Sequence, residues 1–152
     1  MTERFTLADT VQEAVLCWLA TVDADGQPSV SPKEIWHHDD DRFLIADIAS
    51  AGSLRAIRAN PKVCVSLLDL FRQRGHKLLG DATVIAPDDG AFAAAASPLI
   101  EKAGPDFTVR HVIAVRIARQ VPIVAPSWRR FPERDADEHI RRTHDTYGVR
   151  PV

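Results

Sequence analysis

Short apolar segments alternate with turn-forming residues along the first two-thirds of the chain. Runs rich in Val, Ile, Leu, Trp and Thr are typical of β-strands, and Gly, Pro, Asn and Asp mark the turns between them. On this pattern the predicted strands are residues 15–22, 28–36, 42–48, 62–70, 77–85 and 109–117, the last with a continuation to residue 124 as an alternative. Asp25–Gly26 supplies the positive φ angles of a tight hairpin. The first three strands are therefore expected to form a β-meander.

Four helices are predicted from apolar residues at helical spacing and from signals at the helix ends. They are residues 8–14, 50–59, 90–102 and 135–147. Thr6 or Asp9 would cap the first helix. Asn60-Pro61 ends the second, because a proline disfavours helix in the residue before it, and Gly148 would stop the last. Residues 126–134 are expected to form an irregular connection.

Six strands without a regular β-α alternation do not indicate a doubly wound parallel sheet. The pattern fits a mainly β (α+β) protein, a six-stranded antiparallel barrel with helices packed outside it. We expect one domain over residues 1–152, with a core at about residues 10–125 and a C-terminal helix at about residues 135–147.

Composition narrows the class of protein further. The chain has 152 residues, of which 45% are hydrophobic and 26% are charged, as in one soluble globular domain. Its net charge of −2 argues against a nucleic-acid binder, which would carry a basic excess. No apolar run reaches membrane-spanning length, and the N-terminal residues lack the apolar core of a signal peptide. Cys17 and Cys64 are expected to be reduced, buried thiols, and the protein to be cytoplasmic.

A small polar turn opens the predicted helix at residues 50–59. The free N–H groups and the positive end of the helix dipole at such a turn can hold a phosphate, with the Ser53 hydroxyl and the Arg55 charge beside them. The alternative is an ordinary N-terminal cap followed by solvated arginines, since serine is a common cap residue. The turn taken alone favours this second interpretation.

Two further segments indicate a ligand site only in combination with this turn. Ser31-Pro32-Lys33-Glu34 lies in a predicted strand, where a proline indicates either a bulge that aims side chains at a site or a solvated edge. Residues 72–77 place Arg, Gln, Arg, Gly, His and Lys in a predicted loop that is either solvated or part of a ligand site. Trp128, flanked by two arginines, would cover a planar ligand or plug the core.

Several kinds of site are not predicted. Residues 37–41 form a polar turn whose adjacent His and Asp side chains would rarely converge on one metal ion. The chain has no G-x-S-x-G nucleophile elbow, no G-x-G-x-x-G fingerprint and no Walker loop. We assign no metal site and no catalytic residue.

Taken in order, the three segments resemble the pyridoxamine 5′-phosphate oxidase-like, FMN-binding split β-barrel family. The resemblance is carried by an S-P-K-E strand at residues 31–34, an I-A-D-I-A-S turn at 45–50 and a Q-x-G-x-K-L-x-G segment at 73–80. It covers about residues 10–120, and the tail ending Tyr147-Gly148-Val149 also fits. It implies a homodimer of six-stranded split barrels, with FMN bound in the clefts between the subunits.

The resemblance also implies which residues contact the flavin. They are Ser29, Ser31 and Lys33 along the ring, Ala46, Asp47 and Ile48 at its edge, Gly52, Ser53, Leu54 and Arg55 at the phosphate, and Gln73 and Lys77 as further contacts. Many relatives have Lys or Arg in the turn, where this chain has Ala51-Gly52-Ser53. The phosphate charge would therefore be met by Arg55, Lys33, Lys77 or backbone N–H groups.

The leading hypothesis is an FMN-dependent oxidoreductase acting on a small substrate, with NADH or NADPH as a possible reductant. Lys33 and Lys77 are candidates for a positive group near the N1–C2 edge of the flavin, which would stabilise the reduced anion. Glu34 is the only carboxylate in the S-P-K-E strand, and no acid or base is assigned. The terminal Arg and His residues that hold substrate in true oxidases are not recognisable. The alternatives are a flavin-binding carrier, store or sensor without catalysis, and a dimeric barrel that has lost FMN.

Overall fold

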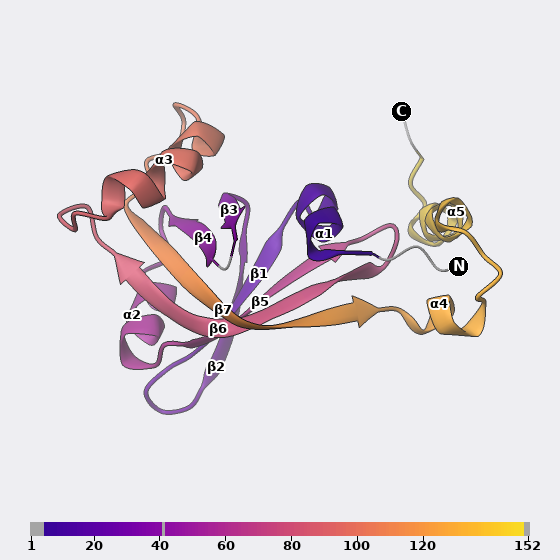
Figure 1. The fold of residues 1–152 in the computed structure, drawn as a ribbon, viewed down its shortest axis with the longest axis horizontal. Helices are drawn as coiled ribbons and strands as arrows, with labels where there is room; N and C mark the ends of the chain where they lie inside the picture. The colour runs from indigo at the N-terminus through magenta and orange to yellow at the C-terminus, as the bar shows by residue number, and fades with distance from the viewer. Residues whose placement is uncertain (1–4, 41, 151–152) are drawn as a thin grey trace.

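A computed structural model describes residues 5–40 and 42–150, and within them seven antiparallel strands form one curled sheet (Figure 1). The strands are β1 Cys17–Val22, β2 Pro28–Lys33, β3 Trp36–Asp39, β4 Arg42–Asp47, β5 Lys62–Asp69, β6 Arg74–Ile85 and β7 His111–Val124. Their spatial order is β2-β1-β5-β6-β7-β4-β3. The mainly β class with an antiparallel split barrel is confirmed, and the prediction of six strands is wrong by one.

The additional strand arises because the chain divides the predicted segment 28–36 at Glu34 and Ile35. β2 ends at Lys33, and a separate strand, β3, runs from Trp36 to Asp39. Residues 37–39 of the predicted turn at 37–41 are therefore strand. β2 and β3 lie at opposite edges of the sheet, so the predicted meander is wrong. The N–H of Ala46 donates to the carbonyl of Ile35 at 2.9 Å, which ties this crossing segment to β4.

β6 and β7 form the longest pair, and Figure 1 shows them running across the molecule. β6 begins at Arg74, so most of the predicted loop at 72–77 is strand. The register shifts between Leu79 and Gly80. β7 pairs with β4 only through residues 111–116, and within the described chain its remaining residues pair with β6 alone.

The described residues form five helices around this sheet. They are α1 Leu7–Glu13, α2 Ala51–Ala59, α3 Phe92–Ala103, α4 Pro126–Arg130 and α5 Ala136–Tyr147. Thr6 caps α1 in a reciprocal capping box with Asp9. The segment expected to be irregular at 126–134 contains α4, which the sequence analysis missed. α3 lies at one end of the β6–β7 pair, and α4 and α5 lie at the other (Figure 1).

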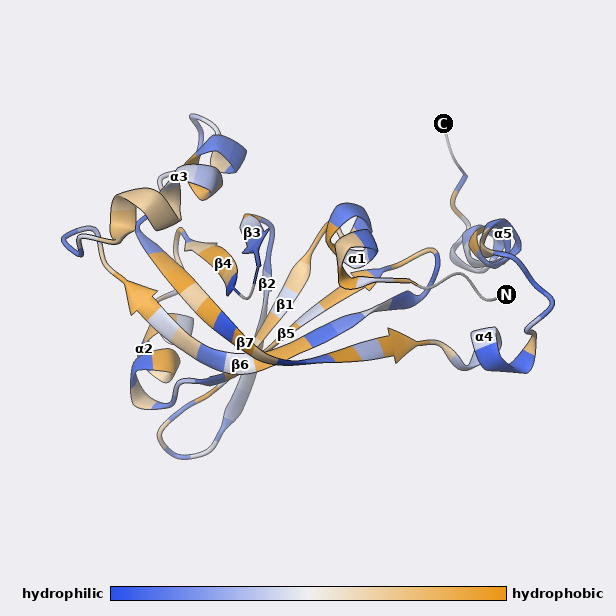
Figure 2. Cartoon of the chain, in the orientation of Figure 1, coloured by the Kyte–Doolittle hydropathy of each residue, from blue (hydrophilic) through white to orange (hydrophobic). Residues whose placement is uncertain are grey.

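Two apolar clusters occupy the two faces of β4, whose residues from Phe43 to Asp47 are all buried. Phe43 and Ile45 point into the barrel, together with residues of β1, β5 and β6. Leu44 and Ala46 point outward and are covered by α3. Figure 2 shows the resulting hydrophobic strands at the centre of the fold. Cys17 and Cys64 are free thiols, as expected, but only Cys17 is fully buried and Cys64 is half-buried.

No helix in the described ranges is long and apolar enough to cross a membrane.

The close approach of β6 and β7 at the register shift predicts a specific sensitivity. A Cβ at Gly80 would lie 2.0 Å from the carbonyl oxygen of Arg116, so the backbone would have to shift. Gly80→Ala is therefore expected to lower the free energy of unfolding by about 1–3 kcal/mol, the usual cost of overpacking. Urea unfolding followed by circular dichroism measures it. Gly90→Ala is the control, because its Cβ would meet no atom within 4 Å; equal stability of the two variants would contradict the prediction.

Candidate functional site

The end of β2 meets the first turn of α2, and polar side chains from the two elements join there. The amine of Lys33 donates a hydrogen bond to the Ser50 hydroxyl. The hydroxyls of Ser31 and Ser53 lie 3.4 Å apart. Ser31 and Lys33 reach the turn together because alternate residues of a strand share one face. Ser50 is the N-cap residue of α2, and its hydroxyl contacts Lys33 instead of capping the helix.

Lys33 is a buried cation, with only 7% of its surface exposed. Its register partner is Cys17, and the next residue across the sheet is Leu67, both fully buried. Burial lowers the pKa of the Lys33 amine, and the negative charge of Asp47 opposes that shift. The amine can donate three hydrogen bonds. It is thus a group through which a bound anion or acceptor could be recognised.

Asp47 is the carboxylate that stabilises this corner. It is 2% exposed, and its Oδ1 accepts the N–H of Ser50 at 2.7 Å. Its Oδ2 lies 3.0 Å from Nδ1 of His111, the first residue of β7. The β4–β7 register places Asp47 opposite His111, so strand pairing produces this contact. No local pattern in the sequence identifies His111, because its partner is distant in the chain.

A cavity of about 200 Å³ opens beside Lys33. Its walls are mostly apolar, with a cation, a carboxylate and a hydroxyl among them. The lining residues are Pro32, Lys33, Glu34, Ile35, Ala46, Ile48, Ser50 and Phe107. A few polar groups in an apolar hollow are typical of small-molecule sites. Phe107 and Ile35 were not predicted, because each comes from a connection whose position depends on the fold.

The predicted cofactor residues divide into those near this corner and those apart from it. Ser31, Lys33, Asp47 and Ser53 make the hydrogen bonds described above, while Ala46 and Ile48 line the cavity. Gly52 is exposed in the first turn of α2, and Ser29 is exposed on β2. Leu54 is different, because its side chain belongs to the barrel core. Arg55 is exposed on α2, and no contact joins it to the cavity.

Lys77 and Gln73 are separated from the corner within one chain. Lys77 pairs across the sheet with Ser66, Ser66 with Trp18, and Trp18 with Pro32. This row is one residue away from the row that contains Lys33, so it faces the opposite side of the sheet. Three strand spacings, about 14 Å, also separate the two lysines. Gln73 lies in the β5–β6 turn and has a positive φ of 54°.

In the described ranges, no group of three or more His, Cys, Asp and Glu side chains is arranged to hold a metal ion. A larger cavity, of about 240 Å³, lies between α1, the β5–β6 turn and α5. None of the predicted cofactor residues lines it. The corner beside Lys33 is therefore the candidate site.

A family model described as pyridoxamine 5′-phosphate oxidase matches residues 6–131 of the chain. No curated protein matches it. Among solved structures, HupZ of Group A Streptococcus is 25% identical, with a TM-score of 0.64, and the alignment covers 75% of this chain and 88% of HupZ.

Two further structures carry names that mention a ligand. HutZ of Vibrio cholerae, a heme storage protein, is 19% identical, with a TM-score of 0.65 and coverage of 82% of this chain and 95% of HutZ. An FMN-binding protein of Syntrophomonas wolfei is 12% identical, with a TM-score of 0.64 and coverage of 76% of this chain and 82% of that protein. At these identities the likeness shows a shared fold.

The buried carboxylate leads to a prediction about stability. Asp47→Ala leaves the Ser50 N–H and His111 without their acceptor, so the free energy of unfolding should fall by about 1–3 kcal/mol. Asp47→Asn keeps an acceptor for the Ser50 N–H and should lose less. Chemical unfolding measures both, with the exposed Asp88→Ala as the control. A loss no larger than that of the control would show that Asp47 does not stabilise the corner.

Proposed function

Because the chain belongs to the pyridoxamine 5′-phosphate oxidase family, we propose that it is an FMN-binding flavoprotein, an oxidoreductase that acts on a small substrate. The observation that carries the proposal is the junction of β2 with α2. There a buried amine and three serine hydroxyls meet a helix N-terminus beside an apolar cavity. FMN has a charged phosphate and a planar ring, so it needs a polar surface for the first and an apolar surface for the second.

The residues at this junction fit the two parts of FMN. The first-turn N–H groups of α2 have no partners within the helix, and the helix dipole favours an anion there. The Ser53 hydroxyl would donate to the phosphate, supplying contacts that the absent turn Lys or Arg would otherwise make. Ala46 and Ile48 would pack against the ring, and Lys33 would donate to an acceptor atom at its edge. FMN would supply the electron transfer, while these residues bind and orient it.

Heme is a second ligand found on this fold, as the name of HutZ states. Heme iron is usually held by a His, Cys, Met or Tyr side chain. Among the residues that the structure describes, none of these types lines the cavity beside Lys33 or the larger cavity at the other end. The composition of the cavity walls therefore favours FMN.

A homodimer with FMN between the subunits is part of the proposal. The face of the sheet opposite Lys33 carries exposed apolar side chains, with Trp18 45%, Val30 58% and Leu68 37% exposed. Exposed apolar groups gathered on one sheet face are typical of an interface. Lys77 lies on that same face, in the register row of Trp18. A second copy could therefore bring Lys77 to a flavin held at the first copy's Lys33.

We propose a cytoplasmic location, since free thiols are usual in a reducing compartment. NADH or NADPH is the proposed source of electrons.

The first test is the visible spectrum of the purified protein and its titration with FMN. Lys33→Met should weaken FMN binding by about tenfold or more, because a hydrogen bond from a charged donor contributes about 1.5–3 kcal/mol. Lys62→Met is the matched control, since Lys62 is exposed and pairs with Asp81 at 2.6 Å. A protein that stays colourless with added FMN would refute the cofactor. If FMN binds, bleaching by NADH or NADPH without oxygen supports an oxidoreductase, and its absence supports a passive flavin binder.

The dimer is tested separately. Trp18→Asp should shift the protein to monomers in analytical ultracentrifugation, because the charge lies on the proposed apolar interface. Trp18→Asp should also weaken FMN binding. Lys77→Ala should weaken FMN binding as well, but it should leave the dimer intact. Ile100→Asp, on the exposed face of α3, is the control. A wild-type monomer that binds FMN tightly would overturn this part of the proposal.

A further inference from the structure

Five side chains stack in one series at the end of the β6–β7 pair, and we call this series the aromatic clasp. Its members are Phe5, Arg74, His76, Trp128 and His139. The guanidinium carbon of Arg74 lies 4.8 Å from the ring centre of Phe5 and 4.5 Å from that of Trp128. The His139 ring stacks on Trp128 at 3.9 Å, and the His76 ring stacks on Phe5 at 6.3 Å. Arg74 is thus the central cation, with a histidine at each end.

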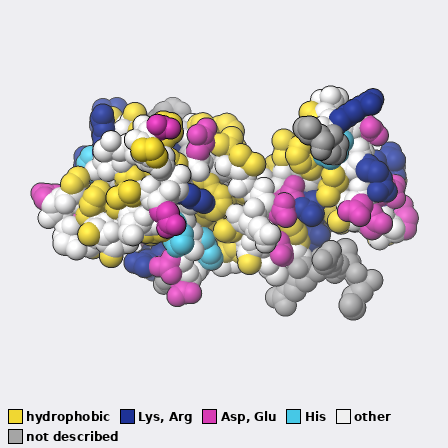
Figure 3. Space-filling view, turned by 90° about the horizontal axis from the view of Figure 1, so that it is seen from above, with side chains coloured by type: hydrophobic (Ala, Val, Ile, Leu, Met, Phe, Trp, Pro, Cys, Tyr) yellow, Lys and Arg dark blue, Asp and Glu magenta, His cyan; other side chains and the backbone are white. Residues whose placement is uncertain are grey.

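The clasp joins the C-terminal arm, residues 125–150, to the rest of the molecule. Its anchor on the arm is Trp128, whose Nε1–H donates to the carbonyl of Arg72 at 2.7 Å. The only other ring contact between arm and body among the described residues is His144 against Phe71. Figure 3 shows the arm as part of a smaller lobe with many charged side chains.

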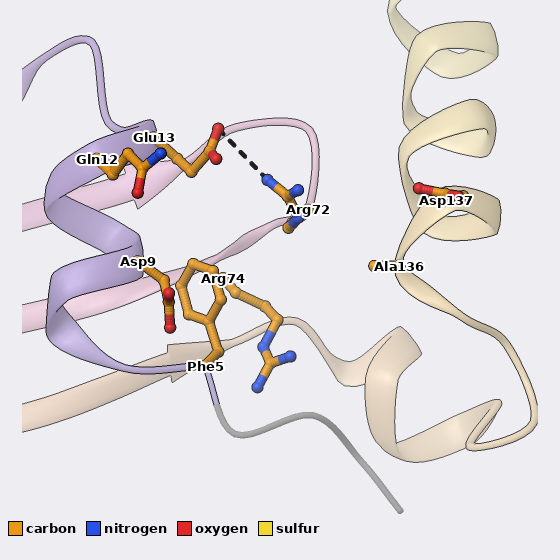
Figure 4. A pocket seen from close by; sticks show the side chains of 8 residues that line it. All are labelled: Phe5, Asp9, Gln12, Glu13, Arg72, Arg74, Ala136 and Asp137. Atoms are coloured by element: carbon orange, nitrogen blue, oxygen red, sulfur yellow. Dashed lines mark ion pairs between the residues drawn. The ribbon is translucent and has the colours of Figure 1, made fainter.

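The larger cavity, of about 240 Å³, separates α5 from the body. Figure 4 shows Ala136 and Asp137 of α5 facing Phe5 and Arg74 across this gap, with the ion pair of Glu13 and Arg72 beside them. Because a gap of this size leaves α5 without close packing on that side, the clasp contributes much of the attachment of the arm.

His139 is 5% exposed, and its Nε2 is buried without a hydrogen-bond partner in the described chain. Burial lowers the pKa of His139, and the charge of Arg134 lowers it further. Glu138 opposes the shift, and Arg142 and Arg74 add to it. A proton on His139 would thus be a buried cation near three guanidinium groups.

His76 is 8% exposed, and its Nδ1 lies 2.7 Å from the hydroxyl of Thr10. Burial lowers the pKa of His76, and the charge of Arg74 lowers it further, while Asp9 opposes the shift. A proton on His76 would also place a second cation close to Arg74. His76 and its partners Phe5 and Thr10 all lie outside the arm, whereas His139 lies in the arm itself.

We propose that the aromatic clasp is an acid-sensitive latch, in which protonation of His139 releases the C-terminal arm. In the released arm the imidazole of His139 regains an ordinary pKa of about 6.5, so the released form binds a proton more tightly than the docked form. The latch is at full strength above that pH and weakens as the pH falls below it. Release opens the cavity and exposes Arg72 and Arg74 to solvent. The latch does not depend on the cofactor.

The indole N–H resonance of Trp128 reports the latch, because its hydrogen bond to Arg72 is lost on release. We expect this resonance, assigned with Trp128→Phe, to move toward the solvent-exposed position between pH 8 and pH 5. Below about pH 6.5 the ratio of released to docked arm should rise by up to about tenfold per pH unit. The resonance of Trp36, buried at the other end of the barrel, should stay in place.

His139→Gln keeps a planar polar side chain that does not titrate, so it should abolish the transition, whereas His76→Gln should retain it. His37→Gln, on β3, is the matched control and should titrate like the wild type. The proposal is overturned if the Trp128 resonance stays in place down to pH 5. It is also overturned if His139→Gln titrates like the wild type, or if the Trp36 and Trp128 resonances move together, since that reports global unfolding.

Discussion

The continuous pairing of β6 with its two neighbours is the constraint on which the rest of the structure depends. β6 pairs with β5 on one side and with β7 on the other, and β7 in turn pairs with β4. The hydrogen bonds of these ladders fix the register, and a slip by one residue would turn every side chain to the opposite face. The contact between Asp47 and His111 exists only in the observed register. The position of the candidate site and the attachment of the arm thus both depend on this one sheet.

The two faces of that sheet differ in the residues that they carry. On the inner face the apolar residues of the barrel surround Lys33, whose charge is met by a hydroxyl and a nearby carboxylate. On the outer face Trp18 and Lys77 lie in one exposed row. Lys33 and Lys77 therefore lie on opposite faces, and in the proposed dimer the two lysines would come from different subunits.

The sequence predicted most of the fold because strands buried on one face alternate and turns have distinctive residues. The hairpin at Asp25–Gly26 and the cap at Thr6 are local signals, and both are present in the structure. The break between β2 and β3 at Glu34 and Ile35 was missed. At this point the chain passes from one edge of the sheet to the other, and no local sequence pattern marks that passage. β6 was predicted to begin too late, since Arg74 and His76 look like loop residues until the fold places Trp128 against Arg74 and Thr10 against His76.

The candidate site was predictable only in part for the same reason. Ser31, Lys33 and Ser53 belong to motifs and meet at the corner, and the structure does not test their binding of a ligand. His111 and Phe107 carry no motif and reach the site only through the fold. Leu54 was predicted to contact the phosphate, and its side chain packs in the core.

The half of β7 that pairs with β6 alone has a consequence for association. An exposed strand edge is a template on which another chain can add a strand, and this is a common route to aggregation. This edge carries Pro122, which has no N–H to donate, and the exposed polar residues Arg119 and Gln120. Such residues discourage strand addition. The protein can therefore extend a long ribbon beyond its barrel while remaining protected against uncontrolled polymerisation.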